Sequence, residues 1–125
     1  MVGAKGPKML RLAARHADIW SWYVEERSDL VEFGPKLEAL EAACVEVGRD
    51  PATIGRSAGV VVEPTSFTGS AEVLGVPVRG SAEEIAAAFR GFRTGGFTQL
   101  ELLLWPPTIA ALDAMAPVLE LLDAD

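Results

Sequence analysis

Short apolar segments alternate with amphipathic segments along almost the whole chain, and this alternation restricts the fold more than any other feature. The amphipathic segments repeat apolar residues at three- and four-residue spacing, which is typical of helices that lie on a core. The apolar segments are short and rich in β-branched and aromatic residues, as strands are. We expect strands at 18–23, 57–63 and 97–104, and helices at 7–17, 35–47, from Ser81 to Gly95, and over a last segment that carries Leu112 to Leu122.

This order of elements predicts an α/β protein. Helices that connect successive strands build a parallel sheet through right-handed crossovers. The segment 57–63 contains three consecutive valines, which indicates a strand covered on both faces and central in the sheet. The pattern leaves two architectures open: a small doubly wound sheet, or part of a TIM-type (β/α)8 barrel.

Turn and cap residues predict where several elements end. Gly48 can adopt the left-handed conformation that stops the second helix. Ser81 and Glu84 have the spacing of a capping box at the start of the third helix. Pro117 removes one backbone donor and should kink the last helix. The segment 65–80 has little periodicity and is expected to be a long loop.

Length, charge and cysteine content exclude several classes of protein. A chain of 125 residues is expected to form a single domain over 1–125. The net charge of -7 has the wrong sign for steering toward nucleic acid or anionic lipid, so neither is expected as a partner. No stretch approaches the roughly 18 apolar residues of a membrane span. Cys44 is the single cysteine, so no internal disulfide can form, and a cytoplasmic location is expected.

Three segments of the chain contain motifs of a known family. The segments are GAKGPKMLRLAARHADIWSW at 3–22, LEALEAACVEVGRDPATIGRS at 37–57 and RGSAEEIAAAFRGFRTGGFTQLELLLW at 79–105. They resemble the luciferase-like monooxygenase family of flavin- or deazaflavin-dependent oxidoreductases. The first segment resembles the family's Gly-Pro helix start, Leu-Ala-Ala helix and Ala-Asp-Gly-Trp strand entry. The second resembles the next helix with its Gly-Arg-Asp-Pro turn, and the third resembles the penultimate helix and final strand.

The resemblance implies that the chain is about half of a (β/α)8 barrel, namely its C-terminal half. A full barrel needs about 250 residues. The implied activity is oxidoreductase or monooxygenase chemistry on a small organic substrate, with flavin mononucleotide (FMN) or the deazaflavin coenzyme. The family positions that hold the redox ring and the substrate lie largely on the earlier strands, so no catalytic residue can be assigned here.

The candidate cofactor-binding residues lie where a further strand, of which only the end is present, leads into the first helix. Gly3, Ala4, Lys5 and Gly6 lead into a helix that starts at Pro7, so free backbone N-H groups and the helix dipole could hold a phosphate. An ordinary strand-to-helix turn is the alternative interpretation. By resemblance, this loop contacts the phosphate end of the coenzyme.

Further candidates follow on the next strand, where Ser21 and Trp22 complete the predicted cofactor set. Ser21 stands where the family often has asparagine, which puts the usual polar contact in doubt. Trp20 and Trp22 should share one face of the strand. Packing is the expected role of Trp20, whereas Trp22 and Trp105 could line a cofactor pocket.

The remaining polar residues are expected to have structural roles. His16 falls late in a helix, where an imidazolium complements the dipole. The charged residues between Glu25 and Asp29 are expected to be solvated surface. No metal site is predicted, because one histidine and one cysteine at distant positions offer no ligand cluster.

Two classes of function are therefore considered. The first is an oxidoreductase in which this chain carries the coenzyme phosphate end of the site. The alternative is a non-catalytic half-barrel remnant or assembly subunit. In either case the open sheet edges favour a homo-oligomer or pairing with a missing N-terminal half.

Overall fold

Five parallel strands form one sheet in the computed structural model, which describes residues 1–23, 25–65 and 75–125. All strand pairs are parallel, as the alternation of elements predicts. The sheet order is β1-β2-β3-β4, with β5 paired to β3. The strands are β1 (Val2–Gly3), β2 (Ile19–Tyr23), β3 (Gly55–Glu63), β4 (Val78–Arg79) and β5 (Gln99–Leu104).

The central position of β3 follows from its register. Ser57 lies opposite both Ser21 of β2 and Gln99 of β5, so these two strands flank β3 on opposite edges. Further along, Val62 lies opposite residues of both β4 and β5, so β4 shares the β2 edge. The prediction of a central strand is confirmed.

The predicted loop at 65–80 is wrong in its last part. Val78 and Arg79 pair with Val62 and Glu63 as β4. Residues 66–74 lie outside the described part of the chain. A strand of two residues is too short to show a periodic pattern in the sequence. It is recognised only by its pairing with β3 in the structure.

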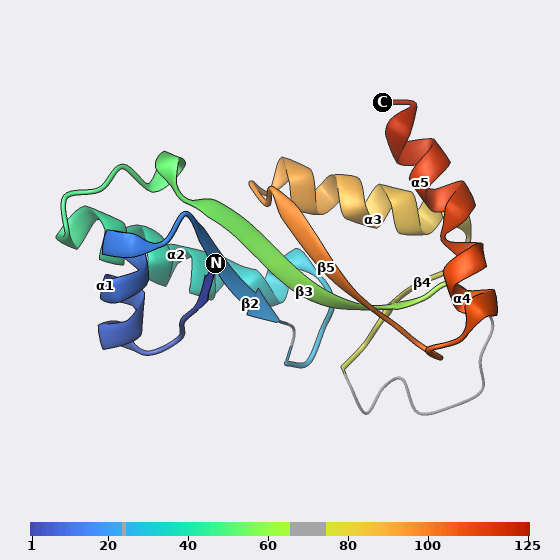
Figure 1. Ribbon diagram of the computed structural model, residues 1–125, viewed down its shortest axis with the longest axis horizontal. Coiled ribbons are helices and arrows are strands. Elements are labelled where there is room, and N and C mark those ends of the chain that lie inside the picture. Colours follow the sequence, from blue (N-terminus) through green and yellow to red (C-terminus); the bar gives the residue numbers. More distant parts are fainter. Residues whose placement is uncertain (24, 66–74) are drawn as a thin grey trace.

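The helices lie beside the sheet in two groups (Figure 1). The pair α1 and α2 lies at the end of the sheet that contains β1 and β2, and α3, α4 and α5 lie at the other end. The bounds are α1 (Pro7–His16), α2 (Leu30–Glu46), α3 (Ala82–Thr94), α4 (Ile109–Ala114) and α5 (Ala116–Asp123), with a 3-10 turn at Pro51–Thr53.

The predicted start of α2 at Pro35 is wrong. The helix begins five residues earlier, because the Asp29 side chain accepts hydrogen bonds from the backbone N-H groups of Val31 and Glu32. Pro35 lies in the second turn, where it costs one backbone hydrogen bond without ending the helix. The cap residue, and not the proline, therefore sets this boundary.

Two other helix boundaries can be compared with the predictions: the start of α3 agrees with its prediction, and the last helix differs from it. At α3 both bonds of the capping box between Ser81 and Glu84 are present. At the C-terminus the break is stronger than the predicted kink, because α4 ends at Ala114 and α5 begins at Ala116. Pro117 lies in the first turn of α5, where its missing N-H leaves no intrahelical bond unmade.

The core lies between the sheet and the helices. The side chains of Trp20, Val60 and Val62 on the strands are buried against those of Leu40 and Ile85 on the helices. Cys44 belongs to the same core, and burial raises the pKa of its thiol. The side chains that alternate with these along β2, β3 and β5 lie on the opposite face of the sheet.

Two glycines give a matched test of backbone conformation. Gly48 has φ of 77°, and a Cβ there would meet no atom within 4 Å, so the left-handed backbone alone disfavours alanine. We expect Gly48→Ala to lower the free energy of unfolding by about 1 kcal/mol. A Cβ at Gly91 would also have free space, but this glycine lies inside α3, so Gly91→Ala should raise the free energy of unfolding by about 0.5–1 kcal/mol. Urea unfolding checks both, and equal signs would contradict this explanation.

Candidate functional site

The carboxyl ends of the parallel strands meet at one edge of the sheet, and the predicted cofactor loop lies there. Gly3 pairs with Ser21, so the loop that follows β1 is next to the end of β2. In open and closed α/β folds, ligands bind at this edge. The loops after β1 and β2 therefore form the first place to look for a site.

The loop from Gly3 to Gly6 leads into a helix end without a side-chain cap. Gly6 is the N-cap of α1, Pro7 is at the start of the helix, and the first turn contains no acidic residue. By contrast, Asp29 and Ser81 cap α2 and α3. A Cβ at Gly6 would meet no atom within 4 Å, so the loop faces open space. Its free N-H groups can bind an anion.

A buried hydrogen bond from Trp20 holds the backbone of the loop from Gly3 to Gly6. The indole N-H of Trp20 donates to the backbone oxygen of Ala4 at 3.0 Å, and both residues are buried. Trp20 therefore has the packing role predicted for it. The same contact fixes the backbone of the candidate loop, since a buried carbonyl would otherwise lack a partner.

Charged side chains gather around Trp22. Lys5 Nζ donates to Glu25 Oε1 at 2.9 Å, and Lys36 Nζ lies 4.0 Å from Glu25 Oε2. The two ammonium groups lie 5.7 and 5.6 Å from the centroid of the Trp22 ring. Such contacts with an aromatic face are attractive. Two lysines, one carboxylate and an indole thus form the polar part of the site.

The contact with Lys5 sets the ionisation of Glu25. The hydrogen bond from Lys5 holds the pKa of the Glu25 carboxyl below its usual value, and the same bond raises the pKa of Lys5. Both groups are therefore charged at neutral pH. An anionic ligand at Lys5 would have to replace Glu25. The charged residues between Glu25 and Asp29 lie at the surface, as expected, but Glu25 is also paired with Lys5.

A second carboxylate organises the loop after β2. Glu32 accepts hydrogen bonds from the backbone N-H groups of Glu25, Glu26 and Arg27, the last two at 2.9 and 2.8 Å. Lys36 Nζ lies 3.6 Å from the same carboxylate. This arrangement holds Glu25 near Lys5, so the position of the competing carboxylate is built into the fold.

A pocket of about 160 Å³ lies beneath the charged group. Ala4, Lys5 and Trp22 line it from the strand side, and Pro35 and Lys36 line it from α2. The pocket is mainly apolar, with lysines at its border. It joins the predicted loop to a helix that the sequence pattern did not connect with it.

The opposite face of the sheet carries a separate polar cluster. Ser57 Oγ and Ser21 Oγ both donate to Glu101 Oε1, at 2.8 and 3.2 Å. The three residues lie on β3, β2 and β5 and face away from the core helices. In a closed barrel this face is the interior. Sequence reasoning missed Ser57 and Glu101, although Glu101 is a lone carboxylate in an apolar strand.

The predicted cofactor set is therefore split in two. Gly3, Ala4, Lys5 and Gly6 form one loop, and Trp22 lies beside it. Ser21 is next to Gly3 in the backbone ladder, but its side chain bonds to Glu101 on the other face. The alternation of side chains along β2 separates Ser21 from Trp22.

Several other polar and aromatic residues lie away from this site. His16 is exposed in the last turn of α1, and Trp105 packs against the core at the end of β5. Arg79 pairs with the buried Glu63, with Nη2 and Oε2 at 3.5 Å. Among residues 1–23, 25–65 and 75–125, no group of three histidine, cysteine, aspartate or glutamate side chains could hold a metal ion.

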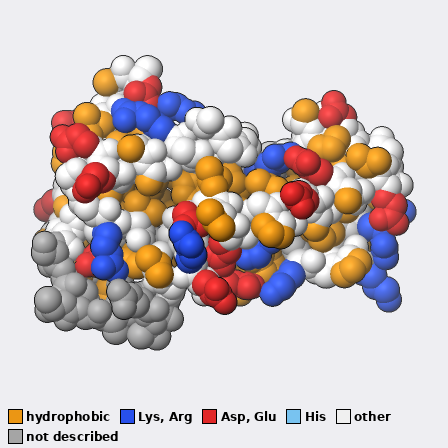
Figure 2. Space-filling model, turned by 180° about the vertical axis from the view of Figure 1, so that it is seen from behind, with side chains coloured by type: hydrophobic (Ala, Val, Ile, Leu, Met, Phe, Trp, Pro, Cys, Tyr) orange, Lys and Arg blue, Asp and Glu red, His pale blue; other side chains and the backbone are white. Residues whose placement is uncertain are grey.

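The molecular surface combines charge of both signs with exposed apolar side chains. Figure 2 shows acidic and basic side chains interspersed on one face, with apolar side chains between them. No helix in the part of the chain that the structure describes is long and apolar enough to cross a bilayer.

Solved structures define the class of the fold. The chain is similar to a long-chain alkane monooxygenase (TM-score 0.73, 11% identity), covering 98% of this chain and 40% of that one. It is also similar to a riboflavin lyase with modified FMN (TM-score 0.71, 14% identity), covering 98% and 42%. A third structure is the coenzyme F420-dependent tetrahydromethanopterin reductase of Methanopyrus kandleri (TM-score 0.67, 14% identity), covering 96% and 50%. The chain thus shares the parallel α/β fold of part of each of these enzymes and spans at most half of each of their chains.

Sequence comparison gives shorter matches, and no family model matches the chain. The chain is 42% identical over 53 residues to a phthiodiolone/phenolphthiodiolone dimycocerosates ketoreductase of Mycobacterium tuberculosis. That match covers 42% of this chain and 13% of the ketoreductase. The corresponding protein of Mycobacterium kansasii is 42% identical over 57 residues, which cover 46% of this chain and 15% of that protein.

Proposed function

We propose that this chain supplies the coenzyme phosphate end of a luciferase-like oxidoreductase that uses FMN or a deazaflavin coenzyme. The loop from Gly3 to Gly6 would hold the phosphate through backbone N-H groups at the start of α1, and Lys5 would neutralise part of its charge. When bound, the coenzyme would supply hydride or oxygen chemistry on a small organic substrate. The chain itself would bind and orient the coenzyme.

One observation carries this proposal: the uncapped end of α1 lies beside Lys5 at the carboxyl edge of a luciferase-like sheet. The helices α2 and α3 satisfy their own N-H groups with the side chains of Asp29 and Ser81. Helix α1 leaves its donors available for a ligand. Two of the similar structures carry FMN or coenzyme F420 in their names, which agrees with an anionic coenzyme.

The competing carboxylate supplies a direct test of the site. Lys5→Gln removes the positive charge and should weaken binding of FMN or the deazaflavin coenzyme by about three- to fivefold, the modest effect expected of an exposed charge. Glu25→Gln removes the internal competitor and should strengthen binding by a similar factor. Calorimetric titration at low salt measures both effects, because salt screens exposed charges.

The matched control is Arg15→Gln, which removes an exposed positive charge from the last turn of α1, away from the N-H groups at the start of the helix. It should leave affinity near that of the parent chain. If Lys5→Gln and Arg15→Gln weaken binding equally, general charge attraction explains the result. If the parent chain binds neither coenzyme, alone or with a partner half-barrel, the proposed function is wrong.

A second candidate function is that of an assembly subunit without catalysis. Within the described ranges, β1 pairs only with β2, and β5 pairs only with β3, so both outer strands have an open edge. Leu102 and Leu103 of β5 are 38% and 50% exposed. Open edges with apolar side chains favour pairing with a second copy or with an N-terminal half-barrel. Light scattering that finds a stable monomer over a wide concentration range would contradict this candidate.

A further inference from the structure

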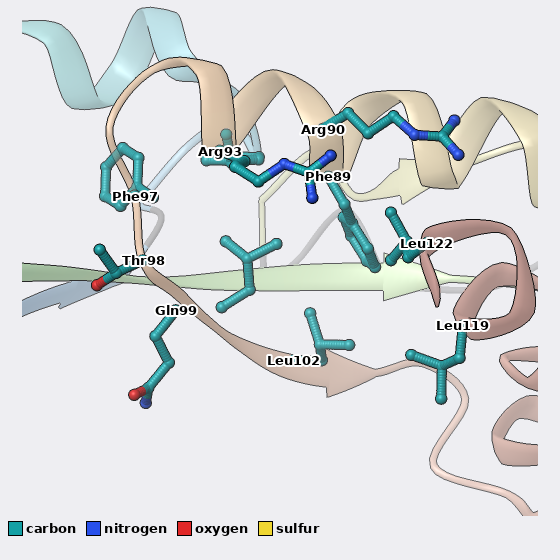
Figure 3. Close-up of a pocket in the computed structure, with 11 residues that line it drawn as sticks. Phe89, Arg90, Arg93, Phe97, Thr98, Gln99, Leu102, Leu119 and Leu122 are labelled. Atoms are coloured by element: carbon teal, nitrogen blue, oxygen red, sulfur yellow. The ribbon is translucent and has the colours of Figure 1, made fainter. Parts of the chain in front are cut away.

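An apolar groove lies on the helix side of β5, far from the loop that contains Lys5. Its volume is about 300 Å³, at the lower end of the range for small-molecule sites. Figure 3 shows the side chains of Phe89 on α3, Leu102 on β5, and Leu119 and Leu122 on α5 converging on one space. Leu102 and Leu119 remain 38% and 52% exposed, so the groove is open to solvent.

Two arginines hold a carboxylate at the border of this groove. Arg90 Nε donates to both carboxylate oxygens of Asp125, at 2.8 and 3.2 Å, and Arg93 Nη2 donates to one of them at 2.9 Å. Arg90 also donates to the backbone oxygen of Leu121 at 2.8 Å. Arg90 and Arg93 both line the groove. A site that binds a carboxylate thus lies next to the apolar groove.

The carboxylate of Asp125 reaches this site from the end of α5 and is only partly buried. Its side chain is 28% exposed, and those of Arg90 and Arg93 are 37% and 64% exposed. Exposed ion pairs are weak, so another carboxylate can compete for the same donors. An alkyl chain attached to that carboxylate would remove Leu102 and Leu119 from water, which Asp125 does not do.

We propose that the groove between α3, β5 and α5 binds the anion of an unbranched fatty acid, with its carboxylate on Arg90 and Arg93 in place of Asp125. Charge complementarity selects this ligand, because the donors already bind a carboxylate. The apolar walls of the groove select an alkyl chain. This site is independent of the proposed coenzyme loop, which lies at the other end of the sheet.

Chain length and head group give the first test. Hexanoate, octanoate and decanoate should bind with increasing affinity, by at most about fourfold per methylene that becomes buried. Nonylammonium has the same alkyl chain as decanoate with a cationic head and should bind at least tenfold more weakly. Calorimetric titration of the purified chain measures the series. Equal affinity for the cation and the anion would overturn the proposal, because nonspecific apolar binding would then suffice.

Three variants test the arginine site. Arg93→Gln should weaken decanoate binding by about three- to fivefold, and Asp125→Asn should strengthen it by a similar factor. Arg15→Gln removes an exposed arginine from α1, at the opposite end of the molecule, and should have no effect (Figure 1). Thermal unfolding verifies that each variant folds. Weaker binding by folded Asp125→Asn would overturn the proposal.

A second copy of the chain is another possible occupant that the experiments must exclude. If another copy covers the groove, decanoate affinity should fall as protein concentration rises, and light scattering should show dimers that decanoate dissociates. That outcome would overturn the proposal. Unchanged affinity over a tenfold range of protein concentration would support it, whatever the coenzyme titrations show.

Discussion

Trp20→Ala is expected to lower the free energy of unfolding by about 3–5 kcal/mol, the usual cost of removing a buried aromatic side chain. Trp20 is 1% exposed and packs between the sheet and the helices. The substitution would leave a large cavity and also deprive the backbone oxygen of Ala4 of its donor. Since domains are stable by about 5–15 kcal/mol, a large part of the stability would be lost.

Two companion variants separate packing from loop anchoring. Trp20→Phe keeps most of the apolar volume but removes the indole N-H, so it should cost about 1–3 kcal/mol. Tyr23→Ala, on the same strand but at a residue that is 61% exposed, should cost clearly less than Trp20→Ala. Urea unfolding followed by circular dichroism measures all three. A Trp20→Ala cost below about 1 kcal/mol would contradict the packing described here.

Phe33→Ala is expected to have an effect of the same size, about 3–5 kcal/mol. Phe33 is 0% exposed, and its ring meets those of Phe97 and Phe92 edge to face, with centroids 5.2 and 6.0 Å apart. Phe92 and Phe97 meet each other in the same way at 5.6 Å. The three rings connect α2 with the end of α3 and with the segment just before β5. Removing the Phe33 ring should therefore weaken the packing of both groups of helices.

Val31→Ala is the matched control for Phe33→Ala. Val31 lies on the same helix but is 71% exposed, so its substitution should change the free energy of unfolding by at most about 0.5 kcal/mol. Denaturant unfolding at equal protein concentration compares the two. Equal losses would contradict a special role of the ring cluster, because alanine has a higher helix propensity than phenylalanine or valine and helix propensity cannot explain a loss.

The candidate site depends on the same core that these variants probe. Trp20 fixes Ala4, and Phe33 follows Glu32, whose carboxylate holds the backbone that carries Glu25. A loosened core should therefore disturb the Lys5 site as well. Coenzyme affinity is best measured in Lys5 and Glu25 variants, which leave these packing contacts intact.

Local sequence signals determined the alternation of strands and helices and the places where several of them end. The capping box of Ser81 and Glu84 and the left-handed Gly48 act within a few residues, so the sequence alone reveals them. The apolar run of β3 likewise predicted its central position. The predicted start of α2 was wrong because Pro35 gave a stronger local signal than the cap at Asp29.

Only the tertiary structure decided which side chains of distant segments meet. The pair of Lys5 and Glu25, the bonds of Ser21 and Ser57 to Glu101, and the arginine site at Asp125 join residues 20 to 80 positions apart. Periodicity shows which face a residue occupies, but not the register of neighbouring strands or the partner across a loop. Those contacts form only when the sheet and its helices pack together, because the packed core fixes the relative positions of the segments.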